Sequence, residues 1–84
     1  MTEIQDKLQT IQTHVFELQR RYSDDRIEFH ALRATWECVR FAWYVCAGDL
    51  DNARDKWERV VAALDDCAVY LTPHQETIFQ EGNQ

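Results

Sequence analysis

The chain has 84 residues, of which 45% are hydrophobic and 12% aromatic, and its nine Lys and Arg against fifteen Asp and Glu give a net charge of −6. This length suits one domain over residues 1–84, and the composition is too apolar for a disordered chain. Two Gly and one Pro are too few for the turns of an all-β sandwich or barrel, Gly-rich phosphate loops are absent, and the acidic balance disfavours direct nucleic-acid binding.

No stretch of the sequence has the pattern of a targeting or membrane segment. The N-terminal residues lack the basic and apolar regions of a signal peptide, and the longest nearly apolar run, Cys38 to Ala47, is too short to span a bilayer. Three cysteines, an odd number, suit a reducing compartment better than a disulfide framework. We therefore expect a cytoplasmic protein that does not enter the membrane.

The first predicted element is an amphipathic helix over residues 2–22. Apolar residues recur there at alternating spacings of four and three, in a heptad seam typical of coiled coils. The seam consists of Ile4, Leu8, Ile11, Val15, Leu18 and Tyr22. Such a seam favours self-association as well as packing within the chain.

The same spacing continues beyond this helix, interrupted only at Asp25. One interpretation is a single helix of about 46 residues, roughly 69 Å long at 1.5 Å per residue, which would need a partner chain. The interpretation that we favour is a break at Ser23, which would cap a second helix with Asp24 and Asp25 in its first turn. Tyr22 and Ile27 would then form a hydrophobic staple across the cap.

The second predicted helix covers about 24–47, and its second half, CVRFAWYVCA, is apolar on nearly every side. Such a helix is expected to be covered on all sides, which predicts that it lies at the centre of the fold. Gly48 ends this helix, and Asp49 or Asp51 caps a third helix over about 50–71.

The third helix has an apolar arc opposite an acidic face. At about 100° per residue the arc spans roughly 120°. Its members are Leu50, Ala53, Trp57, Val60, Val61, Leu64, Cys67, Ala68 and Leu71. Thr72 as N-cap, Pro73 at the first position and Gln75 in a capping box predict a short last helix over 73–80. The predicted fold is therefore all-α, an antiparallel bundle of three helices plus a short C-terminal helix.

Residues 44–61 resemble the middle of a tetratricopeptide repeat. The matching positions, in order, are Gly48, Leu50, Ala53, Trp57, Val60 and Val61. The resemblance implies a tight helical hairpin in which Ala53 permits close approach. It covers about 18 of the 84 residues and departs from the motif at Arg40-Phe41 and near Asp65, and there is no second copy. Small acidic chaperones and adaptors are the class that it implies by analogy.

The residue types that carry catalysis or bind metals do not form a recognisable motif. The Cys and His residues have no CxxC or HxxxH spacing; they are His14, His30, Cys38, Cys46, Cys67 and His74. The cysteines lie in apolar helical runs, where we expect buried and unreactive thiols. We therefore predict no metal, no cofactor and no enzymatic activity.

Three groups of residues are candidates for binding a protein partner. The first is aromatic, since Trp, Tyr and Arg are favoured at interfaces. It comprises Phe16, Phe29, Trp36, Trp43 and Tyr44. The second is a basic stripe with seven-residue spacing, which would dock an acidic partner or pair internally with Glu37 and acids of a neighbouring helix. It comprises Arg26, Arg33 and Arg40. The third is the acidic face of the third helix. Its carboxylates either imitate a line of nucleic-acid phosphates or form an ordinary solvated face. It comprises Asp51, Asp55, Glu58, Asp65 and Asp66.

These features predict a non-enzymatic protein-binding protein, an adaptor or chaperone-like subunit that acts through apolar and aromatic helix surfaces. We expect a homodimer or a subunit of a larger complex, joined through the first helix and the aromatic face of the central helix. The alternative is an acidic inhibitor of a nucleic-acid-binding machine, similar in kind to anti-CRISPR or toxin-immunity proteins. It would use the acidic face of the third helix and lose its partner at high salt.

Overall fold

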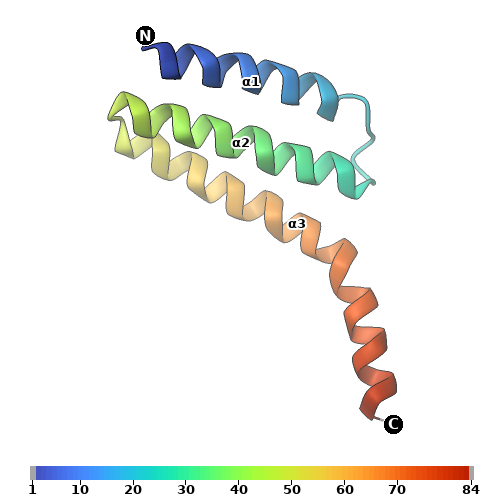
Figure 1. Cartoon of the computed structure of the whole chain (residues 1–84). Coiled ribbons are helices and arrows are strands. Elements are labelled where there is room, and N and C mark those ends of the chain that lie inside the picture. The colour runs from blue at the N-terminus through green and yellow to red at the C-terminus, as the bar shows by residue number, and fades with distance from the viewer. Residues whose placement is uncertain (1, 84) are drawn as a thin grey trace.

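A computed structural model describes residues 2–83 of the chain, and the side chains of residues 2–71. The chain folds into three α-helices, α1 (Glu3–Gln19), α2 (Ile27–Ala47) and α3 (Leu50–Asn83). Figure 1 shows that successive helices run antiparallel, with α2 between the other two. The predictions of an all-helical fold and of a central second helix are confirmed.

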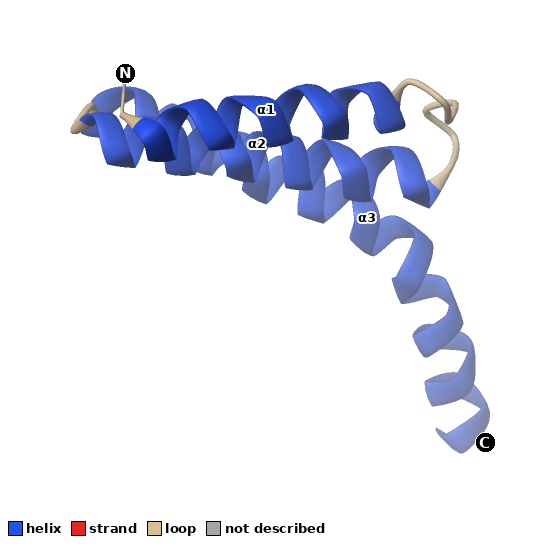
Figure 2. Cartoon of the chain, turned by 45° about the horizontal axis from the view of Figure 1, so that its top comes forward, coloured by secondary structure: helices blue, strands red, loops and turns tan. Residues whose placement is uncertain are grey.

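The three helices form a single open layer. Both α1 and α3 pack on α2 but do not contact each other over the described part of the chain. The shortest dimension of the molecule is 16 Å, not much more than the diameter of one helix with its side chains. Figure 2 shows the helices side by side in this arrangement. The chain alone therefore covers α2 on two sides, where the sequence predicts cover on every side.

The break between α1 and α2 is confirmed, but its predicted cap is wrong. Helix α1 ends at Gln19, three residues before the predicted boundary, and α2 begins at Ile27 with Arg26 as N-cap. The Ser23 hydroxyl donates to the Asp25 carboxylate and so makes no cap for a helix starting at residue 24. The predicted hydrophobic staple of Tyr22 and Ile27 required a helix capped by Ser23, and α2 does not begin there.

The turn between α2 and α3 agrees with the turn predicted from the sequence. Gly48 takes the left-handed conformation at φ 77°, which glycine adopts without the strain of a side chain, and its N–H satisfies carbonyls of the last turn of α2. Asp49 then caps α3 by accepting a hydrogen bond from the backbone N–H of Asn52 at 3.2 Å. The α2–α3 hairpin implied by the tetratricopeptide resemblance is present, with Ala53 only 3% exposed.

The predicted separate helix over 73–80, capped by Thr72 and Pro73, is not confirmed. The structure has one helix through Asn83. The side chains of residues 72–83 lie outside the described ones, so the predicted capping box is outside them as well.

Small apolar side chains and several polar ones, rather than the large apolar ones, are the most buried side chains between the helices. The buried hydrophobic residues among those described are Ala34, Ala53, Val60, Ala63 and Cys67. On α1 the buried residues are Gln5 and Gln19, and the largest fully buried side chain of the described chain belongs to Glu37. The large apolar side chains of α1 and α3 consequently remain at the surface.

Candidate protein-binding faces

The open layer has two faces, and the helical period of about 100° per residue assigns residues to each. One, here called the aromatic–arginine face, carries the bulky residues of α2 together with one of α1. Its members are Phe16, Phe29, Arg33, Trp36, Arg40, Trp43 and Tyr44. The opposite one, here called the apolar face, carries the heptad seam of α1 and half of the apolar arc of α3, with small residues of α2 between them.

Aromatic contacts join α1 to α2 on the aromatic–arginine face. The ring centroids of Phe16 and Trp36 lie 5.7 Å apart, and the guanidinium of Arg40, one turn further along α2, lies 4.8 Å from the centroid of the Trp36 ring. Trp43 and Tyr44 pack edge to face at 5.1 Å. The structure thus brings four of the five predicted aromatic residues to one surface around Arg40. Phe29 lies on the same face nearer the start of α2, where it packs against His30.

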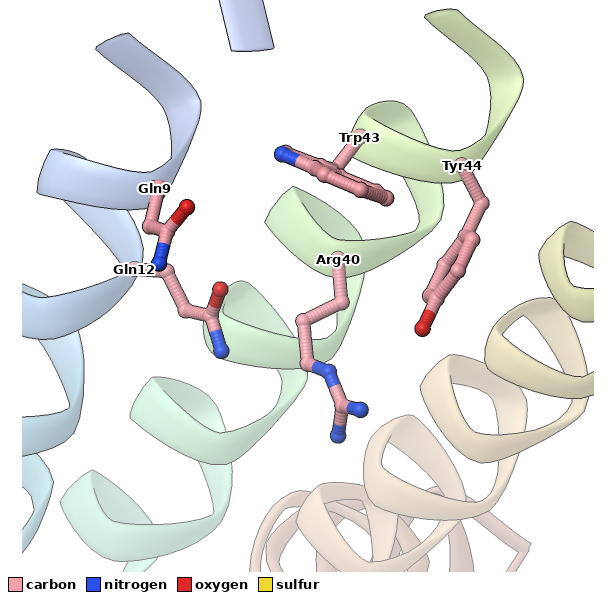
Figure 3. A pocket seen from close by; sticks show the side chains of 5 residues that line it. All are labelled: Gln9, Gln12, Arg40, Trp43 and Tyr44. Atoms are coloured by element: carbon pink, nitrogen blue, oxygen red, sulfur yellow. The ribbon is translucent and has the colours of Figure 1, made fainter. Parts of the chain in front are cut away.

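A pocket of about 190 Å³ opens on this face, lined by Gln9, Gln12, Arg40, Trp43 and Tyr44. Figure 3 shows Gln9 and Gln12 of α1 across from Trp43 and Arg40 of α2, with Tyr44 on the side away from α1. The guanidinium and the amides offer hydrogen-bond donors suited to a carboxylate, and the rings offer apolar walls. Gln9 and Gln12 are not among the residues predicted from the sequence, because polar residues beside a heptad seam carry no signal of their own.

Arg40 belongs to a group of charges around one buried carboxylate. The Glu37 side chain is 2% exposed, and its oxygens lie 3.5 Å from Nη1 of Arg40 and 4.0 Å from Nη1 of Arg59. A buried carboxylate requires such partners, because desolvation of an uncompensated charge is expensive. Among the described residues Arg40 donates one hydrogen bond, to Glu37, so most of its guanidinium donors are available to a ligand.

The predicted basic stripe is divided among three internal ion pairs. Arg33 pairs with Asp66 of α3 at 3.3 Å, and Arg40 pairs with Glu37, as the internal interpretation of the stripe predicts. Arg26 precedes α2 and pairs with Glu28 at 3.0 Å. Hydrogen bonds from the backbone and from Arg26 hold the pKa of Glu28 below its ordinary value.

The predicted acidic residues of α3 do not form one uninterrupted surface. Asp55 accepts hydrogen bonds from Lys56 at 3.2 Å and Arg59 at 3.1 Å, and these two bonds lower its pKa. Asp66 is occupied by Arg33. The remaining three, with seven-residue spacing along the exposed outer edge of α3, are Asp51, Glu58 and Asp65.

The thiols differ from the sequence-based expectation. Cys67 is buried, whereas Cys38 and Cys46 are exposed. Burial raises the pKa of the Cys67 thiol, and the negative charge of Asp66 raises it further. Cys38 and Cys46 lie on the side of α2 that neither α1 nor α3 covers. Among the described residues there is no group of three His, Cys, Asp or Glu side chains placed to hold a metal ion. Within the same residues no helix is long and apolar enough to cross a membrane.

Comparison with known protein families, curated proteins and solved structures found no match to this chain. The functional argument therefore depends on the geometry of the two faces.

Proposed function

We propose that the chain is a non-enzymatic protein-binding protein, an adaptor or chaperone-like subunit of the cytoplasm, whose aromatic–arginine face binds the partner. The observation that carries the proposal is the placement of partly exposed Trp36, Trp43 and Tyr44 around Arg40 beside a pocket of about 190 Å³. The free thiols suit the reducing compartment included in the proposal.

The chemistry of this face supports protein recognition. Trp, Tyr and Arg are the residues that most often dominate binding energy at interfaces, and clustering around a pocket is typical of such sites. The Arg40 guanidinium is already stacked on Trp36, so binding would order it little further. A partner segment with a carboxylate next to an apolar side chain matches the donors of Arg40 and the walls formed by Trp43 and Tyr44.

The alternative, an acidic inhibitor of a nucleic-acid-binding protein, has less support. It needs the carboxylates of α3 as a continuous line, and internal pairs with Arg33, Lys56 and Arg59 occupy two of the five. The aromatic–arginine face is therefore the surface to test first.

The test is capture of partners by the tagged full chain, followed by affinity measurement with the purified partner. We expect Trp43→Ala to weaken the captured complex at least about tenfold. The matched control is Val69→Ala, a truncation of a residue 66% exposed on α3 and away from both faces. Equal affinity of wild type, Trp43→Ala and Val69→Ala would contradict the proposal.

Salt distinguishes the two functions. A complex held by aromatic and apolar contacts is expected to survive a high-salt wash, whereas an acidic surface bound to a basic groove is screened. Loss of the partner at high salt, together with loss on Asp51→Lys but not on Trp43→Ala, would favour the acidic inhibitor.

A further inference from the structure

We propose that the apolar face binds a second copy of this chain, so that two three-helix layers stack into a two-fold symmetric dimer. The proposal does not depend on the function proposed above, which uses the opposite face. It rests on two rows of large apolar side chains on this face, here called ridges, on the small side chains of α2 between them, here called the floor, and on the exposed area of the face.

The first ridge is the heptad seam of α1. The helix turns its glutamines, Gln5 and Gln19 among them, toward α2, and Gln9 and Phe16 toward the aromatic–arginine face. By the helical period its seam then points to the opposite side of the layer. Accordingly, seam residues Ile4, Ile11 and Leu18 are 60%, 47% and 44% exposed.

The second ridge is the outer half of the apolar arc of α3. Asp66 pairs with Arg33 on the aromatic–arginine side, and Trp57 contacts Phe41 on the other, with ring centroids 5.9 Å apart. These contacts fix the rotation of α3. Residues that share the side of Trp57, which is 55% exposed, are Leu50 at 68%, Val61 at 40% and Leu64 at 54%.

The floor between the ridges is made by the uncovered side of α2. Its residues are small or of moderate size and follow the helical period; they are Ala31, Thr35, Cys38, Ala42 and Val45. Apart from Glu28 in the first turn of α2, none of the described residues between the two ridges is charged by this assignment. Except near Glu28, the face is therefore a shallow, uncharged trough between two rows of large apolar side chains.

The exposed area matches what a dimer needs. The exposed fractions of the large side chains on this face correspond to on the order of 700 Å² of apolar surface, taking roughly 150–200 Å² for each whole side chain. Monomeric proteins rarely expose more than about 300–600 Å² in one patch, and a standard interface buries about 800 Å² per partner. The apolar second half of α2, which the layer covers on only two sides, gains cover on a third side from the second layer.

The pattern of this face selects a second copy as the occupant. A two-fold interface uses the same patch on both subunits, and a ridge–trough–ridge surface is self-complementary because the ridge of one copy fits the trough of the other. The seam also repeats with the regular heptad spacing that favours helix self-association. With a net charge of −6 on each copy, charge attraction does not drive the contact.

The test is the molar mass of the purified full chain over a range of micromolar concentrations, by light scattering or sedimentation. We expect twice the 10.0 kDa mass of the chain. Ile11→Glu and Leu64→Glu, one on each ridge, should raise the dimer dissociation constant at least about tenfold, because each change occurs twice in a two-fold interface. Val69→Glu adds the same charge at an exposed apolar position of α3 outside the trough and should leave the dimer intact.

Salt dependence and thiol reactivity distinguish a dimer held by the apolar face from one held by charge or by the opposite face. Added salt should strengthen the association, because it screens repulsion between two acidic copies without weakening an apolar contact. Cys38 lies in the trough and is exposed in the single chain, so in a Cys46→Ser background its reaction with a thiol reagent should slow as protein concentration rises.

A wild-type chain that stays monomeric at all concentrations, with helical circular dichroism intact, would overturn the proposal and leave the face to a different protein. Equal dissociation constants for Leu64→Glu and Val69→Glu would overturn it as well. Trp43→Ala should remain dimeric. If the chain is monomeric but binds a partner through Trp43, only the dimer proposal is refuted. If the chain is dimeric but Trp43→Ala does not change its affinity for the partner, only the proposed function is refuted.

Discussion

Replacing Arg40 with Met should destabilise the fold strongly, because it removes the nearer cation from the buried carboxylate of Glu37. That carboxylate is 2% exposed, and the cation left to it is Arg59, 4.0 Å away. Breaking a fully buried ion pair from one side costs about 3–5 kcal/mol. Because Arg59 remains and the Arg40 side chain is itself 26% exposed, we expect a loss of about 2–3 kcal/mol in the free energy of unfolding.

The matched control is Arg33→Met, which removes the same side-chain type from the same helix. Arg33 pairs with Asp66, whose side chain is 49% exposed, so water can replace the lost cation. That variant should lose less than about 1 kcal/mol. Urea unfolding followed by far-ultraviolet circular dichroism, at one fixed protein concentration because of the proposed dimer, measures both values.

The reverse substitution is expected to behave differently. Glu37→Leu replaces the buried carboxylate by an apolar side chain of similar size and leaves two guanidiniums that water can reach. We expect it to be neutral or stabilising by about 1 kcal/mol, and the Glu37→Leu/Arg40→Met double variant to be far more stable than Arg40→Met. A loss for Arg40→Met no larger than for Arg33→Met would refute the reasoning that Glu37 depends on Arg40.

Three other predictions concern the turn, the acid range and the thiols. Gly48→Ala should cost about 1–2 kcal/mol in unfolding free energy, because an alanine is strained in the left-handed backbone conformation of Gly48. A steric clash does not contribute, since nothing lies within 4 Å of the added Cβ. The pKa of Asp55 is lowered from 3.8, so its stabilising contribution is present above that value and disappears as pH falls through the folded-state pKa. Asp55→Asn should therefore flatten the loss of stability below about pH 4 in acid titrations of urea unfolding. Cys67, buried and with a raised pKa, should react with a thiol reagent much more slowly than Cys38 in the Leu64→Glu variant, which weakens the proposed dimer; equal rates would contradict the burial of Cys67.

Local signals in the sequence determined the boundary between α2 and α3, but not the end of α1 or the start of α2. Gly48 and Asp49 act within a few residues of themselves, through backbone conformation and a cap, so the boundary between α2 and α3 could be predicted. The start of α2 could not, because Ser23 had a competing partner in Asp25, and side-chain hydrogen bonds of Ser compete with capping.

The heptad seam of α1 and the apolar arc of α3 were also visible in the sequence. Periodicity says which residues share one side of a helix, but it does not say which neighbour covers that side. Only the tertiary structure shows that α1 packs on α2 through Gln5 and Gln19, leaving Ile11 and its neighbours exposed. It likewise separates the seam from Trp43 and Tyr44, which the sequence analysis combined in one interface.

The candidate site divides in the same way. Composition and spacing identified the aromatic residues and Arg40 on α2, because they recur at the helical period. Gln9 and Gln12 joined them only because α1 folds back antiparallel onto α2, a contact between segments far apart in the sequence. The sequence alone determined the helices and their apolar sides. The rotation of each helix about its axis, set by packing of small side chains and by Glu37 between α2 and α3, decided which residues became surface.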